Sequence, residues 1–300
     1  MRSSSSARAA LLAFASLGVL VGCNAGASSG LPGASERTTQ SSPLVAQKIY
    51  VVNNGDNTVR TYRPDGTQTI PTITGLNGPR GVAVDANGKI YVASFVPGSN
   101  SSNMVTTYLP DGTQTTPTIT QGLCGPDAVA IDRHFKIYVV NVCGGVTIYK
   151  ADGTPDGEIT AGLNGPQGIT IDSHGKIYVT NYSYPSGQSF MTTYDQSGMQ
   201  IQPTITAGLN FPEGILVDAA GKIYIANFGA NDVTTYRADG TQLSTITAGL
   251  VGPEGMAFND GKFYVANING GDLTTYRKAT GKETAPTISG LSSPIGVAFH

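Results

Sequence analysis

Residues 79–93 read PRGVAVDANGKIYVA. It places two apolar runs, at residues 81–84 and 90–93, on either side of the turn-forming segment Asp-Ala-Asn-Gly. Two short apolar runs that are joined by such a turn predict an antiparallel β-hairpin. Neither run alternates between apolar and polar residues, which is typical of strands that are covered on both faces.

The same stretch recurs along the chain at intervals of 40 to 47 residues. Each copy contains a Lys-(Ile or Phe)-Tyr element, which begins at Lys48, Lys89, Lys136, Lys176, Lys222 and Lys262. A Pro-x-(Gly or Ala) element accompanies it, and its prolines are Pro79, Pro126, Pro166, Pro212, Pro253 and Pro294. Repetition at a period of this length is typical of propellers and solenoids.

Each repeat contains four strand-like segments, termed A, B, C and D. In the second repeat we expect them at residues 81–85, 89–93, 104–108 and 116–120. Four short antiparallel strands at this period predict one blade of a propeller. The sequence therefore predicts an all-β fold, a six-bladed β-propeller over residues 48–300.

The phase of the repeats predicts how the ring closes. The first repeat opens at its strand B, residues 48–52, whereas the chain ends on a strand A segment, residues 296–300. We therefore expect the C-terminal strand to complete the first blade. This 3+1 closure removes two exposed sheet edges.

The residues before the first repeat have a different composition. An apolar run over residues 9–21 follows two arginines, has the length of a signal h-region and is too short to span a bilayer. The run ends at Cys23 in a segment that resembles the bacterial lipobox, and a plain secretory signal is the alternative. We expect residues 1–22 to be a lipoprotein signal peptide and residues 23–47 to be a flexible tether.

The lipobox resemblance implies lipidation at Cys23 and an exported protein of the cell envelope. The lipid anchor would be its only contact with a membrane, and Asn24 favours the outer membrane in a Gram-negative cell. Charged residues make up 13% of the chain and the net charge is −2. Because no bulk positive charge attracts a phosphate backbone, we expect no nucleic acid partner.

The repeat pattern Pro-x-Gly-(Val/Ile)-(Ala/Thr)-(Val/Ile)-Asp, followed by Gly-Lys-Ile-Tyr-Val-(Ala/Thr)-Asn, resembles the NHL repeat and its gluconolactonase-like relatives. The resemblance covers residues 48–300 and implies the fold, while propellers host many functions. Streptogramin lyase and peptidyl-amidoglycolate lyase are related propellers that rely on histidines at the channel mouth. Here His134, His174 and His300 are expected on the opposite face, so both activities are set aside.

Loops that join strands D and A, or strands B and C, open on the same face of an antiparallel blade. The residue after each repeat proline is expected to ring the mouth of the central channel on this face. These residues are Arg80, Asp127, Gln167, Glu213, Glu254 and Ile295. They vary inside a repeated frame, which is typical of functional positions, although a wet channel mouth also favours polar side chains.

Two of the B–C loops on this face are longer than the others, at residues 94–108 and 181–194. Aromatic residues occur in them and in neighbouring loops of the same face, at Phe95, Tyr182, Tyr184, Phe190, Phe211 and Phe228. Long loops with aromatic residues on a rigid scaffold are typical of a binding site, and tolerated surface variation is the alternative.

Two functional hypotheses follow. The first is a binding module that presents this loop face to a small molecule, carbohydrate or protein and requires no cofactor. The second is a gluconolactonase-like hydrolase, because those enzymes hold a divalent cation with oxygen ligands at the channel mouth. That resemblance implies Asp127, Glu213 and Glu254 as ligands for calcium or magnesium, with Arg80 as a competing partner for one acid. No Pro-Asn-Gly turn occurs, so the sequence favours the binding module and leaves catalytic residues unassigned.

Cys124 and Cys143 are expected to form a disulfide. They flank the A–B hairpin of the third repeat, and the antiparallel register places Cys143 opposite about Gly125, one residue from Cys124. An exported protein meets an oxidising compartment, and lipidation of Cys23 leaves an even number of cysteines. Two reduced thiols are the alternative.

Overall fold

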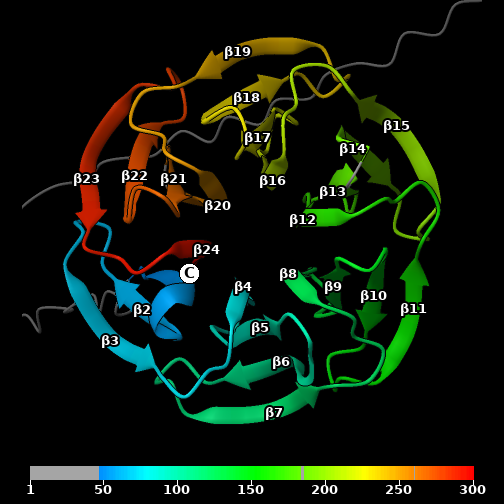
Figure 1. Ribbon diagram of the computed structural model, residues 1–300, viewed down its shortest axis with the longest axis vertical. Coiled ribbons are helices and arrows are strands. Elements are labelled where there is room, and N and C mark those ends of the chain that lie inside the picture. The colour runs from blue at the N-terminus through cyan, green and yellow to red at the C-terminus, as the bar shows by residue number, and fades with distance from the viewer. Residues whose placement is uncertain (1–46, 184–185, 260) are drawn as a thin grey trace, which may run out of the picture. The chain divides into compact units, whose positions relative to one another are not determined.

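A computed structural model describes residues 47–183, 186–259 and 261–300, and the side chains of residues 99–102 are also outside its description. The signal peptide, Cys23, nearly all of the tether and Tyr184 therefore lie outside the described residues. Within them, six four-stranded antiparallel sheets are arranged around a central axis (Figure 1). None of the described helices is long and apolar enough to cross a membrane.

Each blade contributes its strand A to the centre of the ring and its strand D to the rim (Figure 1). The A strands are β4 (Pro79–Val84), β8 (Pro126–Ile131), β12 (Pro166–Ile171), β16 (Pro212–Val217), β20 (Pro253–Asn259) and β24 (Pro294–Phe299). The B strands are β1 (Ile49–Asn53), β5 (Ile90–Val96), β9 (Ile137–Asn141), β13 (Ile177–Ser183), β17 (Ile223–Asn227) and β21 (Lys262–Asn267).

The C and D strands complete the blades toward the rim. The C strands are β2 (Thr58–Tyr62), β6 (Ser99–Tyr108), β10 (Gly145–Tyr149), β14 (Gln188–Tyr194), β18 (Asp232–Tyr236) and β22 (Asp272–Arg277). The D strands are β3 (Gln68–Ile73), β7 (Gln114–Ile119), β11 (Pro155–Ile159), β15 (Gln200–Ile205), β19 (Gln242–Ile246) and β23 (Glu283–Ser289). A 3-10 turn, η1 (Asn54–Asp56), follows β1.

The predicted 3+1 closure is confirmed. The first sheet has the order β24-β1-β2-β3, so the last strand of the chain pairs with the first. Ile49 lies opposite Phe299, and Lys48 and His300 exchange two backbone hydrogen bonds of 2.8 and 3.0 Å. The strand begins at Pro294, two residues earlier than the sequence predicts.

Apolar residues of the A and B strands bury their side chains between neighbouring blades. One cluster joins Tyr91, Ala93 and Val105 of the second blade to Val129 and Val139 of the third. Burial on both faces explains why these strands do not alternate between apolar and polar residues.

The repeated strand C tyrosines tie the blades together with hydrogen bonds. The hydroxyls of Tyr194 and Tyr236 donate at 2.8 Å to the backbone carbonyls of Ala161 and Ala207 in the preceding inter-blade connection. Tyr149 donates in the same way to the Gln121 carbonyl at 2.6 Å. Each of these rings therefore packs inside its own blade, while its hydroxyl donates to the connection from the preceding blade.

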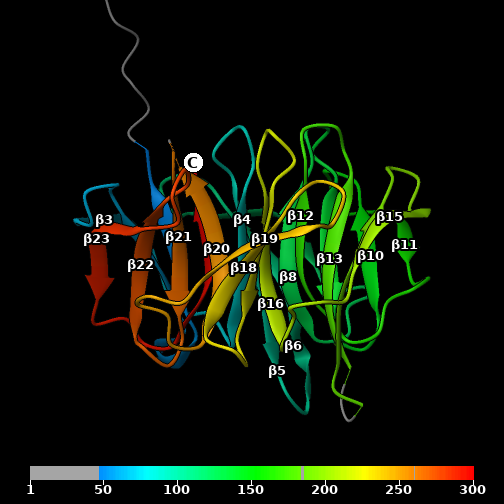
Figure 2. The same ribbon diagram turned by 90° about the horizontal axis from the view of Figure 1, so that it is seen from above.

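The two long B–C connections are largely extended hairpins. Strand β5 continues to Val96 and pairs with Ser99 of β6, and β13 continues to Ser183 and pairs with Gln188 of β14. Both hairpins project beyond the other connections on one face of the ring (Figure 2). The sequence predicts loops here because it does not show that the inserted residues continue the ladder.

Candidate functional site

Every inner strand has a β-bulge at the residue that follows its proline. In β16, Pro212 lies opposite Asn227 and Ile215 lies opposite Ile225, so two residues of β16 face one residue of β17. The same shift occurs in the other five A strands. A bulge of this kind re-aims a side chain. Here it explains how the residue after each proline comes to line the channel.

The glycine after the bulged residue lets the inner strands approach one another. A Cβ atom at Gly168 would collide with the backbone carbonyl of Glu213, and one at Gly214 with the carbonyl of Glu254. The Pro-x-Gly element therefore has a packing reason at its third position and a free choice of side chain at its second.

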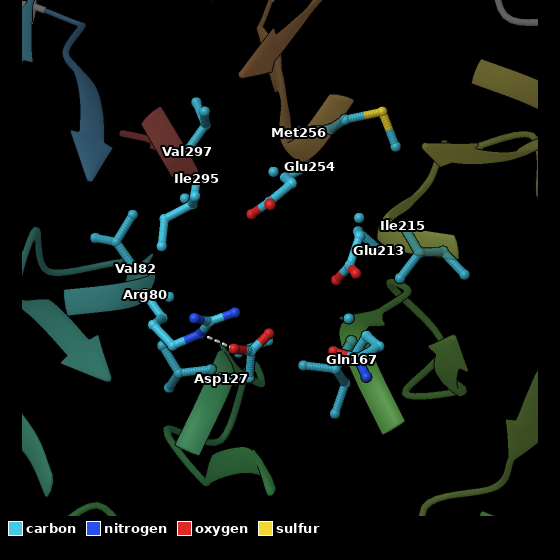
Figure 3. A pocket seen from close by; sticks show the side chains of 18 residues that line it. Arg80, Val82, Asp127, Gln167, Glu213, Ile215, Glu254, Met256, Ile295 and Val297 are labelled. Carbon is cyan, nitrogen blue, oxygen red and sulfur yellow. Dashed lines mark hydrogen bonds and ion pairs between the residues drawn. The ribbon is translucent and has the colours of Figure 1, made fainter. Parts of the chain in front are cut away.

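All six residues that the sequence places at the mouth line one cavity of about 100 Å³ (Figure 3). They are Arg80, Asp127, Gln167, Glu213, Glu254 and Ile295. A second set of lining residues is apolar and comes from the same strands: Val82, Val129, Ile169, Ile215, Met256 and Val297. The site is thus a ring of five polar side chains and Ile295, termed the polar ring, next to a ring of apolar side chains.

The polar ring has an uneven distribution of charge. The Arg80 guanidinium forms an ion pair and hydrogen bond with Asp127 of the next blade, as one of the sequence alternatives predicts (Figure 3). That carboxylate raises the pKa of Arg80 above its ordinary value, against the effect of burial. The Gln167 side chain donates to the Gly165 carbonyl at 3.2 Å, which orients its amide at the rim.

Glu213 and Glu254 lie on the other side of the ring. Their carboxylates point into the cavity and are half-buried, and no described side chain donates a hydrogen bond to either (Figure 3). Burial raises the pKa of Glu213 well above its ordinary value, helped by the charges of Glu254 and Asp127. Burial, followed by the charge of Asp127, raises the pKa of Glu254 to about 8. Arg80 opposes both shifts.

The acids of this ring do not form a good site for a divalent cation. Calcium and magnesium require several oxygen ligands that converge on one point. Asp127 is engaged by Arg80, whose positive charge lies in the same cavity. Across the described ranges, no group of three or more His, Cys, Asp or Glu side chains is placed to hold a metal ion.

An aromatic pair lies on the face of the ring that bears the cavity mouth. The rings of Tyr182 and Phe211 stack with centroids 3.6 Å apart and an interplanar angle of 29°. Phe211 is 37% exposed and is two residues from Glu213 in sequence. Its backbone is fixed because its N–H donates to the Ser189 hydroxyl at 3.2 Å and its carbonyl accepts from the Phe228 N–H at 2.9 Å.

The remaining aromatic candidates do not join this pair. Phe95 lies at the end of β5, where its ring faces Gly125 of the third blade. Phe190 pairs with Asn181 in the ladder between β13 and β14 and is half-buried. Phe228 contributes its backbone N–H to the Phe211 segment. Tyr184 lies outside the described residues.

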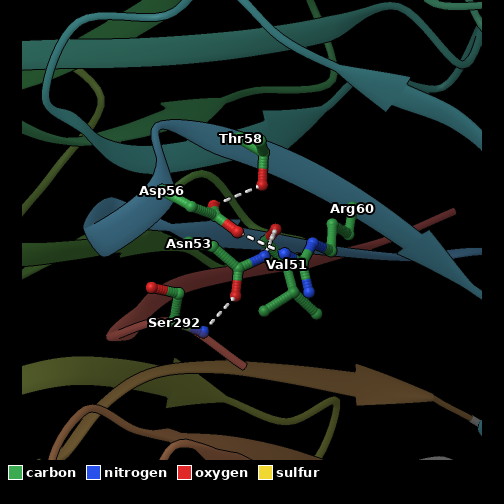
Figure 4. A network of polar contacts seen from close by, with 6 residues as sticks. All are labelled: Val51, Asn53, Asp56, Thr58, Arg60 and Ser292. Atoms are coloured by element: carbon green, nitrogen blue, oxygen red, sulfur yellow. Dashed lines mark hydrogen bonds and ion pairs between the residues drawn. The ribbon is translucent and has the colours of Figure 1, made fainter. Parts of the chain in front are cut away.

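The asparagine at the end of the repeated strand B pattern, for which no structural role was predicted, shapes the loops of this face. Asn53 ends β1, and its side-chain carbonyl accepts a hydrogen bond of 3.2 Å from the Ser292 N–H, beside the Asp56–Arg60 ion pair (Figure 4). Asn141, Asn181, Asn227 and Asn267 accept equivalent bonds in their blades. The signal was present in the sequence, because Asn closes five of the six strand B elements.

The predicted disulfide between Cys124 and Cys143 is confirmed, with Cα atoms 5.7 Å apart. The bulge in β8 explains its register. Pro126 lies opposite Asn141 and Val142 donates to the Gly125 carbonyl, so the ladder is shifted by one residue and Cys143 faces Cys124. Both half-cystines are exposed on the mouth face.

The histidines lie in the region that the sequence assigns to them. His134 and His174 are in the turns after β8 and β12, and His134 lines a separate cavity of about 210 Å³ between these turns. His300 lies near Gly88 in the A–B turn of the second blade. These turns are at the opposite end of the inner strands from the polar ring.

No family model and no curated protein matches the chain. Among solved structures, a chain of the nidogen–laminin complex matches with a TM-score of 0.72 and 17% identity, over 84% of this chain and 98% of that one. A streptogramin B lyase structure matches with a TM-score of 0.56 and 14% identity, over 81% and 73%.

A functionally unknown protein from Desulfotomaculum acetoxidans also matches, with a TM-score of 0.60 and 16% identity, over 84% of this chain and 85% of that one. At such identities the likeness concerns the fold alone. Together with the six sheets and their closure, it shows that the chain is a six-bladed β-propeller.

Proposed function

We propose that this chain is a binding module that acts through the face bearing the polar ring and the two long hairpins. The observation that supports the proposal is the pair of half-buried carboxylates in one cavity, Glu213 and Glu254, to which no described side chain donates a hydrogen bond. Such groups oppose folding, so a sequence selected for stability alone would not place two of them side by side. Perturbed acids in a cavity are typical of a functional site.

The same face has the other features of a recognition surface. It presents the Tyr182–Phe211 stack, the two projecting hairpins and a disulfide that holds the third-blade loops. Aromatic rings that are held rigidly supply contact area at little entropic cost. The nidogen–laminin structure is a protein complex built with a similar fold, and this agrees with a protein as the bound partner.

We further propose that the propeller is exported and held in the cell envelope by lipid on Cys23. This rests on the apolar run over residues 9–21 and on the position of Cys23 at its end. The tether that follows would let the propeller reach about 25–30 Å from the membrane by the flexible-linker estimate.

Arrays of peptides, glycans and small molecules test the binding function directly. The probes would be full-length Cys23→Ser protein, a mouth variant with Tyr182→Ala and Phe211→Ala, and a control with His134→Ala and His174→Ala on the opposite face. We expect ligands that the parent and the control retain and the mouth variant loses. Ligands that only the His134→Ala, His174→Ala control fails to bind would assign the binding function to the opposite face.

A parallel assay addresses the hydrolase hypothesis. The same proteins would be tested for lactone hydrolysis with calcium, with magnesium and with a chelator. We expect no cation-dependent turnover, because Arg80 occupies the acid that such a site needs. Turnover that requires a cation and is lost in Glu213→Gln would establish the hydrolase instead.

A further inference from the structure

The charges around the central cavity do not balance. Each inner strand contributes one residue that faces the others, and the charged ones are Arg80 of β4, Asp127 of β8, Glu213 of β16 and Glu254 of β20. Three acids thus face one cation, which is already paired with Asp127. The neutral Gln167 of β12 and Ile295 of β24 add no charge, and neither Glu213 nor Glu254 forms an ion pair with a described residue.

The cavity limits what can enter. Its volume is about 100 Å³, whereas pockets that enclose a whole small-molecule ligand measure about 300–1,000 Å³. An ammonium or guanidinium group with a few waters fits this space, and a complete metabolite of ordinary size does not. The rest of a ligand must therefore remain outside the mouth.

The face around the cavity mouth supplies a surface for the rest of the ligand. The Tyr182–Phe211 stack lies on the mouth face, and Phe211 precedes Glu213 by two residues on a backbone that two hydrogen bonds fix. Aromatic rings attract cations and pack against aliphatic chains. Two carboxylates in the cavity and an aromatic stack on the same face therefore suit a long side chain with a cationic head.

We propose that the mouth receives a lysine or arginine side chain of a partner polypeptide, with its head group between Glu213 and Glu254 and its stem along Tyr182 and Phe211. This rests on the proposed binding function and specifies its ligand. The cation replaces the positive partner that these acids lack. Because a polypeptide stays outside the cavity, the small cavity volume is no obstacle to its binding.

The methionine methyl groups give a direct readout in the full-length Cys23→Ser protein. Met256 lines the cavity and is 6% exposed, whereas Met199 is 66% exposed and lies in the turn before β15. Carbon-13-labelled methionine would be followed by NMR during titration with end-blocked Gly-Gly-X-Gly-Gly peptides, where X is lysine, arginine or norleucine. We expect the lysine and arginine peptides to shift Met256 and leave Met199 in place, and the norleucine peptide to shift neither.

Carboxamide variants test the two acids. Glu213→Gln and Glu254→Gln should each weaken the lysine peptide about tenfold or more, because each removes a charge-assisted contact. Glu158→Gln, on the exposed strand β11, is the matched control and should bind like the parent. Binding should strengthen as the pH rises through about 8, because the cation requires the ionised form of Glu254.

The other outcomes each overturn the proposal in a distinguishable way. Equal shifts by the norleucine peptide would show that binding does not require a cation, and the proposed binding function would still stand. Tighter binding of n-butylammonium than of the lysine peptide would replace the partner polypeptide with a small amine. A shift by calcium chloride that depends on Glu213, without one by the lysine peptide, would assign a metal. If no probe shifts Met256 while array ligands still bind, the ligand has different chemistry.

Discussion

Glu254 is a residue of the polar ring that destabilises the folded state and is suited to binding a cation. Its carboxyl lies among Glu213, Asp127 and Arg80 and has no hydrogen-bond donor among the described side chains. Its pKa is raised to about 8, so the folded state holds a proton that the unfolded chain releases above about pH 4.5. The free energy of unfolding therefore falls as the pH rises from about 4.5 to about 8.

Replacement of Glu254 by Gln should remove this loss. Because the amide has no charge to bury, we expect Glu254→Gln to raise the melting temperature more at pH 8 than at pH 5. The gain should be about 2–4 °C for each kcal/mol that the folded state recovers. Thermal unfolding of parent and variant across pH 5–9 measures it, with Glu158→Gln as the exposed control. A melting temperature that is unchanged at pH 8 would contradict the raised pKa.

The ring residues show what sequence can establish at this scale. Variation after a fixed proline identifies the six positions, because the surrounding repeat marks them as equivalent. It does not reveal the bulge that aims them inward, because the extra residue is defined by pairing with strand B. The sequence likewise does not show which of three acids pairs with Arg80, because the pairing depends on the distances between side chains of different blades.

Among the elements, the hairpins that face the mouth were only partly predictable. Turn signals and apolar runs place the A and B strands to within two or three residues. The long B–C insertions have no comparable signal, since Gly, Ser and Asn occur both in loops and in extended hairpin ends. The sequence therefore shows that these connections are longer than the others, but it does not show that they form extended hairpins.

The disulfide of the third blade joins the connection before β8 to the connection between β9 and β10. It closes a loop between residues 19 apart, which restricts the unfolded chain. We expect the Cys124→Ala and Cys143→Ala double variant to lose about 3 kcal/mol of unfolding free energy by the chain-entropy model. Urea denaturation under non-reducing conditions measures this loss. Addition of reductant should lower the parent to the level of the variant, and a parent that is insensitive to reductant would contradict the role.

The strand B asparagines fix the loops from inside five of the six blades. Asn267 is fully buried, accepts from the Val251 N–H at 3.2 Å and donates to Asp272 at 2.7 Å and Thr274 at 3.1 Å. Asn267→Ala should lower the free energy of unfolding by about 1–3 kcal/mol, because buried groups lose their partner. Asn87→Ala, in an exposed turn, is the control and should change it by less than about 0.5 kcal/mol. Equal effects of the two substitutions on denaturation would refute this.

For the whole molecule, the position of Cys23 predicts where the propeller resides. If Cys23 is lipidated, Cys23→Ser should move the protein from the membrane fraction to the soluble fraction of the cell. The Cys124→Ser and Cys143→Ser variant controls for the loss of cysteine and should stay with the membranes. Fractionation followed by immunoblotting measures both, and retention of Cys23→Ser in the membranes would exclude the lipid as the anchor.

Closure of the ring is the contact on which the whole propeller depends. Strand β24 lies between β1 and the axis, so it joins the two ends of the propeller and supplies Ile295 to the cavity. Without it, β1 would have an open edge, and the sixth blade would lose the neighbour that covers Ala257 and Ala266. Deletion of residues 296–300 should therefore lower the melting temperature sharply, by more than any single substitution considered above.

A transposed variant separates closure from packing. Residues 294–300 would be moved ahead of Lys48 and joined to it by an Asn-Gly turn, since His300 and Lys48 already exchange backbone hydrogen bonds. Each blade then forms from continuous chain, the strand is retained, and the link between the ends is lost. We expect its melting temperature to lie between those of the parent and the deletion variant. Equality with the parent would show that β24 contributes packing alone, because the ring would then be stable without a strand that holds its two ends.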